Sequence, residues 1–391
     1  MGQRHRKHLL LIYCQFAFML LFTDVSAFGQ NAAIKYLRAD ISLRQSFALA
    51  PNAWVMLEEA LTRPIDDQDR KIVAAAEGAL VEFKHGAALQ TCDWQMSIED
   101  GPLADTSHRG AIRELVAVVA LRARIRFYKD TDAAVSDALD GITAARHLTL
   151  DGSIASVLFG YKAEREATAV LAEGLPLLSS AQLAHLQGTL VTLPTGATMG
   201  KALKSEKTER DDLLNIAKSS GNREELVTKL LTHVPTLQND HQRANALVDG
   251  CGGTVDGVEA CIQQQEAFYQ QWISRFDLAP QEFEKAYAQS WAEIQRNNPI
   301  AATFTPVLPR LRWAEAYEET RRTLLRAAIA VQRFGPKALD KYLDPYYGRP
   351  FSYVPMKDGF ELKSNLKENG KELELTVTSA VKNARGQSGT P

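Results

Sequence analysis

The chain has 391 residues, of which 45% are hydrophobic and 24% are charged, and its formal net charge is −2. This composition is ordinary for a globular protein and leaves enough apolar side chains for a sizeable core. The mild acidity gives no electrostatic reason to expect a nucleic-acid partner or attraction to anionic lipid.

The first 27 residues have the features of a cleavable export signal. A cationic start at residues 4–7 precedes an apolar run, Leu9–Phe22, which is shorter than the roughly 20 residues that span a bilayer. Val25 and Ala27 then match the small-residue pattern that signal peptidase reads. We therefore expect cleavage after Ala27 and a periplasmic or secreted protein. The alternative is an uncleaved amphipathic or membrane-anchoring helix.

The rest of the chain contains no apolar run of membrane length. The longest candidate, Leu115–Leu121, is bounded by Arg113 and Arg122. The first 27 residues carry three basic residues and one acidic residue, so the mature chain has a net charge of −4. We expect a soluble mature protein without stable membrane insertion.

Helical periodicity dominates residues 28–298. An early apolar stripe repeats every three or four residues and ends near Gly86 (Ile72, Ala76, Leu80 and Phe83). Residues 86–107 are rich in turn-forming residues, and residues 112–148 form a helical hairpin that turns at 129–132. Further helices are expected at about 153–173, 180–192, 199–218, 223–234, 257–276 and 280–297.

The C-terminal part changes character after a proline-rich break at 298–310. A long amphipathic helix follows, with its apolar stripe from Trp313 to Val331, and Gly335 ends it. Alternating apolar and polar residues on both sides of a Pro/Asp/Gly turn predict a β-hairpin over residues 351–363. Leu373–Val377 is a candidate third strand.

These patterns predict a mainly α fold with a small C-terminal β-hairpin or three-stranded element. The helical part is an array of antiparallel helix pairs, similar to tetratricopeptide packing but without a clear repeat. The expected organisation is a signal peptide (1–27), a helical array (28–298), a linker with the long amphipathic helix (299–345), a small β element (346–382) and a disordered tail (383–391).

Three cysteines lie outside the signal segment. Cys251 and Cys261 are close in sequence and are separated by a glycine-rich stretch, so we expect a disulfide between them in an oxidising compartment. Cys92 then has no cysteine with which to pair. It is expected to be either buried as a small hydrophobic residue or present as a free thiol.

Acidic and histidine side chains are dense in the segment 86–109. Asp93, Asp100 and His108 are the weak candidates there for acid–base chemistry, because a carboxylate–histidine pair can move protons. The same residue types are ordinary turn formers and helix caps, and we favour this structural interpretation.

No pattern in the sequence predicts a metal or a cofactor. The histidines are scattered, without the spacing of a zinc site, and Asp249, Asp256 and Glu259 miss the calcium-loop spacing. No nucleophile elbow, phosphate-binding loop or dinucleotide fingerprint occurs.

The C-terminal order of elements resembles two groups of proteins. A helix precedes an Asp-Pro-aromatic turn at 344–350, an aromatic strand, and an Asp-Gly-Phe strand at 358–364. The first group is a family of uncharacterised exported helical proteins of bacteria, which the segment Cys92–Trp94 and the hairpin 121–148 also resemble. That resemblance covers most of the chain and implies no activity.

The second resemblance is to the C-terminal region of the major pseudopilins of type II secretion and covers about residues 313–364. It implies a calcium-binding loop after the last strand. Residues 365–371 instead contain two lysines and one carboxylate, whereas calcium prefers several oxygen ligands. The leader also lacks the Gly-Phe-x-x-x-Glu site, so we expect neither bound calcium nor a pilin.

Two functional hypotheses follow. The first is a non-enzymatic binding or scaffold protein of the cell envelope, with a protein or peptide partner in a groove between helices. The alternative is a hydrolase-like enzyme with its site in the 86–109 segment. The absence of a catalytic motif from the sequence favours the first.

Overall fold

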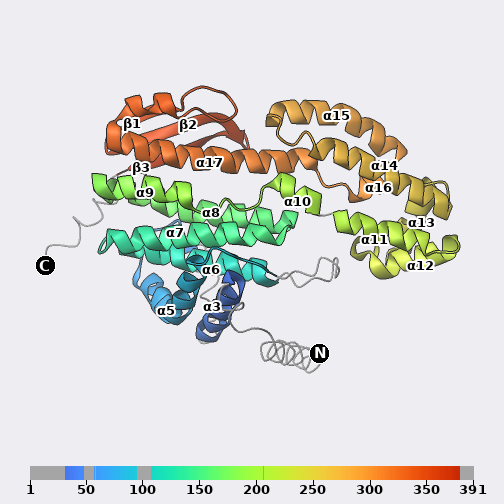
Figure 1. Ribbon diagram of the computed structural model, residues 1–391, viewed down its shortest axis with the longest axis horizontal. Helices are drawn as coiled ribbons and strands as arrows, with labels where there is room; N and C mark the ends of the chain where they lie inside the picture. Colours follow the sequence, from blue (N-terminus) through green and yellow to red (C-terminus); the bar gives the residue numbers. More distant parts are fainter. Residues whose placement is uncertain (1–30, 48–56, 58, 95–106, 206, 379–391) are drawn as a thin grey trace.

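The computed structural model describes residues 31–47, 57, 59–94, 107–205 and 207–378. Within these residues the protein is mainly helical, with a small antiparallel sheet near the C-terminal end (Figure 1), as the sequence predicts. The expected signal peptide and C-terminal tail lie outside the described residues. No helix in the described ranges is both long and apolar enough to cross a membrane.

The largest apolar core joins the N-terminal helices α3 (Ala32–Phe47), α5 (Asp67–Ala87), α6 (Ser107–Arg126), α7 (Thr131–Leu148), α8 (Ile154–Gly174) and α9 (Ser180–Thr192). The predicted hairpin is the pair α6 and α7. Helix α8 packs closely on α7 because Gly160 has no side chain. A Cβ atom there would lie 2.7 Å from the carbonyl oxygen of Ala145.

A second, smaller core is rich in aromatic side chains. It is formed by α10 (Met199–Ser205), α15 (Pro280–Asn297), the C-terminal half of α14 (Val255–Ile273) and the N-terminal half of α17 (Leu308–Phe334). Trp272 is fully buried at its centre, with the rings of Phe283 and Tyr287 5.3 and 5.1 Å from its own.

A third core lies at the far end of the molecule from the sheet (Figure 1). It contains α11 (Lys207–Lys218), α12 (Arg223–His233), α13 (His241–Gly250), α16 (Pro299–Phe304) and the N-terminal half of α14. Helix α14 therefore belongs to two cores, and its first half links α11–α13 to the aromatic core.

The sheet contains β1 (Ser352–Met356), β2 (Gly359–Glu368) and β3 (Lys371–Thr378), in that order and all antiparallel. Tyr353 pairs with Leu362 across the hairpin. The inner face buries Phe360, Leu362 and Val377 in the first core, together with Leu324 of α17. This face covers the C-terminal half of α17, as the predicted apolar stripe requires.

Several element boundaries differ from the sequence prediction. The expected helix 199–218 corresponds to α10 and α11, and residue 206 between them lies outside the described residues. Helix α13 lies in a segment for which no helix was expected. The proline-rich break contains the short helix α16, because Asn298 caps it by accepting a hydrogen bond from the Ala301 amide and Pro299 occupies its first position.

Candidate functional site

Two of the three acid–base candidates, Asp93 and His108, lie within the described residues. Asp93 exchanges backbone hydrogen bonds with the side chain of Asn31, at 2.7 and 3.0 Å. Asp100 lies outside the described residues. His108, in the first turn of α6, pairs through Nε2 with Asp151 at 3.0 Å.

Asp151 is the centre of a polar cluster that caps α8. It accepts hydrogen bonds from His108, from the hydroxyl of Ser156, and from the amide and hydroxyl of Ser153. Burial opposes the charged form, but these hydrogen bonds hold the pKa of Asp151 below its usual value. Ser156 donates to the carboxylate and not to His108. A nucleophile activated by histidine needs the opposite order, so this cluster is not a hydrolytic triad.

The expected Cys251–Cys261 disulfide is not formed: both are free thiols in the structure. The two thiols are nevertheless neighbours. Burial, with the contact from Cys261, raises the pKa of Cys251 to about 12. The sequence spacing correctly predicted that the two cysteines lie close together, but the predicted bond between them is absent. Cys251 caps the C-terminal end of α13, and Cys261 lies within α14. Cys92 is free and buried, and burial raises its pKa well above the usual value for a thiol.

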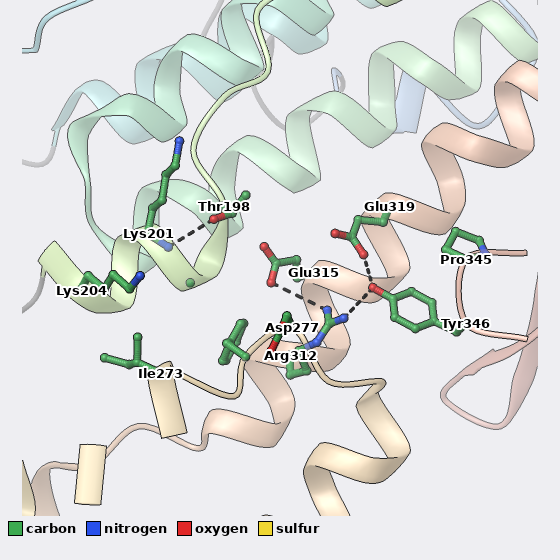
Figure 2. Close-up of a pocket in the computed structure, with 12 residues that line it drawn as sticks. Thr198, Lys201, Lys204, Ile273, Asp277, Arg312, Glu315, Glu319, Pro345 and Tyr346 are labelled. Carbon is green, nitrogen blue, oxygen red and sulfur yellow. Dashed lines mark hydrogen bonds and ion pairs between the residues drawn. The ribbon is translucent and has the colours of Figure 1, made fainter. Parts of the chain in front are cut away.

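A pocket of about 460 Å³ lies beside the second core, whose residues Ile273 and Phe276 line it. Its walls come from α10, the turn after α14, the N-terminal half of α17 and the segment that leads into the sheet (Figure 2). Its lining residues are Thr198, Gly200, Lys201, Lys204, Ile273, Phe276, Asp277, Arg312, Glu315, Glu319, Pro345 and Tyr346.

Arg312 is the central side chain of this pocket and is only 4% exposed. Its Nε donates to the carbonyl oxygen of Leu278 and its Nη2 donates to the hydroxyl of Tyr346, both at 2.8 Å. Its guanidinium carbon lies 5.9 Å from the ring centre of Phe276 and 5.1 Å from that of Tyr346. These contacts fix the guanidinium in place.

One nitrogen of that guanidinium has no hydrogen-bond partner. Nη1 of Arg312 is buried, and the closest charged group, Glu315 Oε2, is 3.7 Å away, which is too far for a hydrogen bond. A buried donor on a charged group is expensive to leave unpaired. The pocket is therefore lined by a fixed guanidinium, one of whose buried donors lacks an acceptor among the described residues.

Two glutamates one turn apart on α17 face the same pocket. Glu315 accepts a hydrogen bond from the Met199 amide at 3.0 Å, and burial together with the neighbouring Glu319 raises its pKa to about 7. Glu319 is exposed and accepts a hydrogen bond from the hydroxyl of Tyr346 (Figure 2). Acidic groups therefore lie beside the cationic floor.

Two lysines line the α10 side of the pocket. Lys201 and Lys204 are three residues apart, so they lie on one face of the helix, and both are exposed. Neither forms an ion pair with any residue that the structure describes. Asp277 lines the opposite wall and is likewise unpaired within the described residues.

A buried ion network continues along α17 behind the pocket. Glu164 of α8 accepts hydrogen bonds from Arg146 and Arg322 at 2.5–3.0 Å. Glu318 is 2% exposed, and neither of its carboxyl oxygens has a hydrogen-bond partner. Burial and the nearby charge of Glu164 raise the pKa of Glu318 to about 8, although Arg322 lies 3.5 Å away.

This pocket was not predicted from the sequence. The apolar stripe predicted from Trp313 to Val331 places Trp313, and Tyr317 one turn later, on the buried side of the helix. In the structure those two aromatic residues are half-buried, whereas Arg312 and Glu315 are buried. The available signal was a run of charged residues three or four apart along one helix (Arg312, Glu315, Glu318, Glu319 and Arg322).

Comparison with known proteins adds no assignment. Within the described residues, no group of three or more His, Cys, Asp or Glu side chains is arranged to hold a metal ion. No protein-family model matches the chain, no curated protein matches its sequence, and no solved structure matches its fold.

Proposed function

We propose that this chain is a non-enzymatic binding protein of the cell envelope, and that its inter-helix pocket binds the carboxylate of a peptide partner. The observation that carries the proposal is Arg312, whose guanidinium lines the pocket and whose buried Nη1 has no acceptor among the described residues. An arginine fixed in this way is a typical receptor for a carboxylate.

The charges around Arg312 favour a single negative charge on the ligand. Lys201 and Lys204 add positive charge at the α10 wall, which favours an anion. Glu315 and Glu319 stand on the other side of the guanidinium, and like charges repel. A dianionic phosphate would meet more of that repulsion than a carboxylate, so a carboxylate fits the pocket better.

The size and position of the pocket favour a peptide. Its volume of about 460 Å³ lies in the range of sites for small ligands, roughly 300–1,000 Å³. Its walls combine aromatic rings with polar groups, and the pocket lies between helices α10, α14 and α17, which pack together in the second core. The features of an export signal in the first 27 residues support a role in the envelope.

Calorimetric titration with a minimal peptide tests this proposal. The probe is N-acetyl-trialanine, which carries a C-terminal carboxylate and no other charge, and it is compared with its C-terminal amide. The free acid is expected to bind about tenfold or more tightly than the amide, since a hydrogen bond to a charged group is worth about 1.5–3 kcal/mol. Equal affinity for both peptides, or binding of neither, would contradict the proposal.

Variants tie that preference to the pocket. Arg312→Gln is expected to abolish the preference for the acid, whereas Arg310→Gln, an exposed arginine on the same helix, leaves it intact. Because Arg312 also bonds Leu278 and Tyr346, its variant can lose stability. The exposed pair Lys201→Gln and Lys204→Gln therefore serves as a second test and is expected to weaken binding of the acid alone.

A further inference from the structure

We infer that the ligand is a short free peptide, with its carboxylate on Arg312 and its amino group on Glu319. This inference rests on the proposed function and adds the identity of the second recognised group. It separates a small zwitterionic peptide from the C-terminal tail of a protein, whose amino end would lie far outside the pocket.

The pocket offers hydrogen-bond acceptors as well as hydrogen-bond donors. Glu315 uses Oε1 to accept from the Met199 amide, and its Oε2 is directed toward Arg312 without reaching hydrogen-bond distance. Glu319 uses Oε2 to accept from Tyr346 (Figure 2), which leaves Oε1 available. Glu319, which is exposed, can therefore accept from an ammonium group, which brings three donors.

The cationic and acidic side chains that line this pocket do not neutralise one another. Lys201 and Lys204 have no ion-pair partner within the described segments, and neither do Asp277 and Glu319. Three cationic and three acidic side chains thus line one cavity, and among them only Arg312 and Glu315 approach within 4 Å. A ligand with one group of each charge satisfies both sets.

The size of the pocket limits the length of the ligand. Both sets of charges belong to a single cavity of about 460 Å³. A peptide that uses both ends inside it has to be short, because each residue of extended chain adds roughly 3.3–3.6 Å to its length. A di- or tripeptide satisfies this condition, whereas a protein tail presents its carboxylate alone.

The experiment compares trialanine with N-acetyl-trialanine by calorimetric titration of the intact protein. Acetylation removes the positive charge and leaves the carboxylate unchanged. Trialanine is expected to bind about tenfold more tightly than its acetylated form. In the variant Glu319→Gln, the ratio of the affinities for trialanine and for its acetylated form should fall toward one, because trialanine binds more weakly. The substitution alters an exposed side chain. Glu293→Gln, an exposed glutamate of α15, is the matched control.

The possible results separate the two proposals. If both peptides bind equally and Arg312→Gln still abolishes the preference for a carboxylate, the short-peptide inference is wrong and the proposed function stands. If acetylation weakens binding equally in wild type and in Glu319→Gln, the amino group is recognised elsewhere and the inference is again overturned. If neither carboxylate nor amino group affects affinity, both proposals fail.

Discussion

Buried carboxyl groups on α17 differ in how they are stabilised. Glu315 has a backbone amide as a partner, whereas Glu318 has none for either oxygen. Arg322 gives its hydrogen bonds to Glu164, so Glu318 receives only a more distant attraction. Burial of an unpartnered carboxylate is costly, and the group is therefore held in its neutral form around neutral pH.

This protonation predicts how stability depends on pH. The pKa of Glu318 is about 8 in the folded protein and about 4.3 in an unfolded chain. Between these values the folded state holds a proton that the unfolded state releases. The free energy of unfolding therefore falls as pH rises, by up to about 1.4 kcal/mol per pH unit from this group, and levels off above pH 8.

Glu318→Gln replaces the neutral acid by a group that does not titrate. Urea unfolding at pH 5 and pH 8 is expected to show that the stability of this variant relative to wild type increases between the two pH values. Glu293→Gln, at an exposed position, should show a constant difference. Parallel pH curves for wild type and Glu318→Gln would contradict a buried neutral carboxyl.

The three cysteines show what the spacing of residues in the sequence can predict and what it cannot. For Cys92 the sequence left burial and a free thiol as alternatives, and in the structure it is both buried and free. The proximity of Cys251 and Cys261 was also predicted, but they remain thiols. Spacing limits how far apart two side chains can lie, whereas a bond needs a particular geometry of both backbones, here set by the end of α13 and the first turns of α14.

Helix packing in the first core depends on small residues at the points where helices cross. A Cβ atom on Gly160 would lie 2.5 Å from the Thr149 methyl group and 2.7 Å from the Ala145 carbonyl oxygen. Gly188, in the exposed part of α9, has no neighbouring atom within 4 Å of the same position. The two glycines thus serve different purposes in the same kind of element.

Alanine at these two positions should have opposite effects. Gly160→Ala is expected to lower the free energy of unfolding by about 1–3 kcal/mol, because α8 must move away from α7. Gly188→Ala is expected to raise it by about 0.5–1 kcal/mol through helix propensity. Thermal or urea unfolding of both variants makes the measurement. A neutral or stabilising Gly160→Ala would show that the two helices are not closely packed there.

Most elements could be predicted from the sequence because their periodicity is local. The α6–α7 hairpin and the β1–β2 hairpin each combine a clear pattern with a turn between the two halves. Helices α13 and α16 were missed, because they are short and lie in segments rich in glycine or proline. Their helical form depends on capping by Asp240 and Asn298 and on burial in the third core.

At the scale of the whole molecule, α17 is the element that connects the parts. Its N-terminal half lies in the aromatic core and its C-terminal half lies under the sheet in the first core (Figure 1). The pocket lies along the N-terminal half of this helix, beside the second core. Helices α11–α13 contribute to neither of these two cores.

This arrangement predicts uneven stability across the fold. The third core is smaller than the first and joins the rest mainly through α14 and α16. Hydrogen exchange followed by mass spectrometry is expected to show faster exchange in α12 than in α6, since local opening is easier where less apolar surface is buried. Equal protection of the two helices would indicate that the molecule unfolds as a single unit.

The pocket could not be predicted from the sequence, because separate segments of the chain form its walls. Its walls come from residues 198–204, 273–277, 312–319 and 345–346, which are far apart in the sequence and meet only through tertiary packing. None of these segments contains a recognisable motif. The expectation that a partner binds in a groove between helices stays a prediction.

A crystal structure of the protein with trialanine tests the central claim most directly. The account predicts a peptide in the pocket, with its carboxylate within hydrogen-bond distance of Arg312 Nη1. Crystals of Arg312→Gln grown and soaked in the same way should contain no peptide there. An empty pocket in wild-type crystals at saturating peptide, or a peptide whose carboxylate contacts another part of the molecule, would contradict the claim.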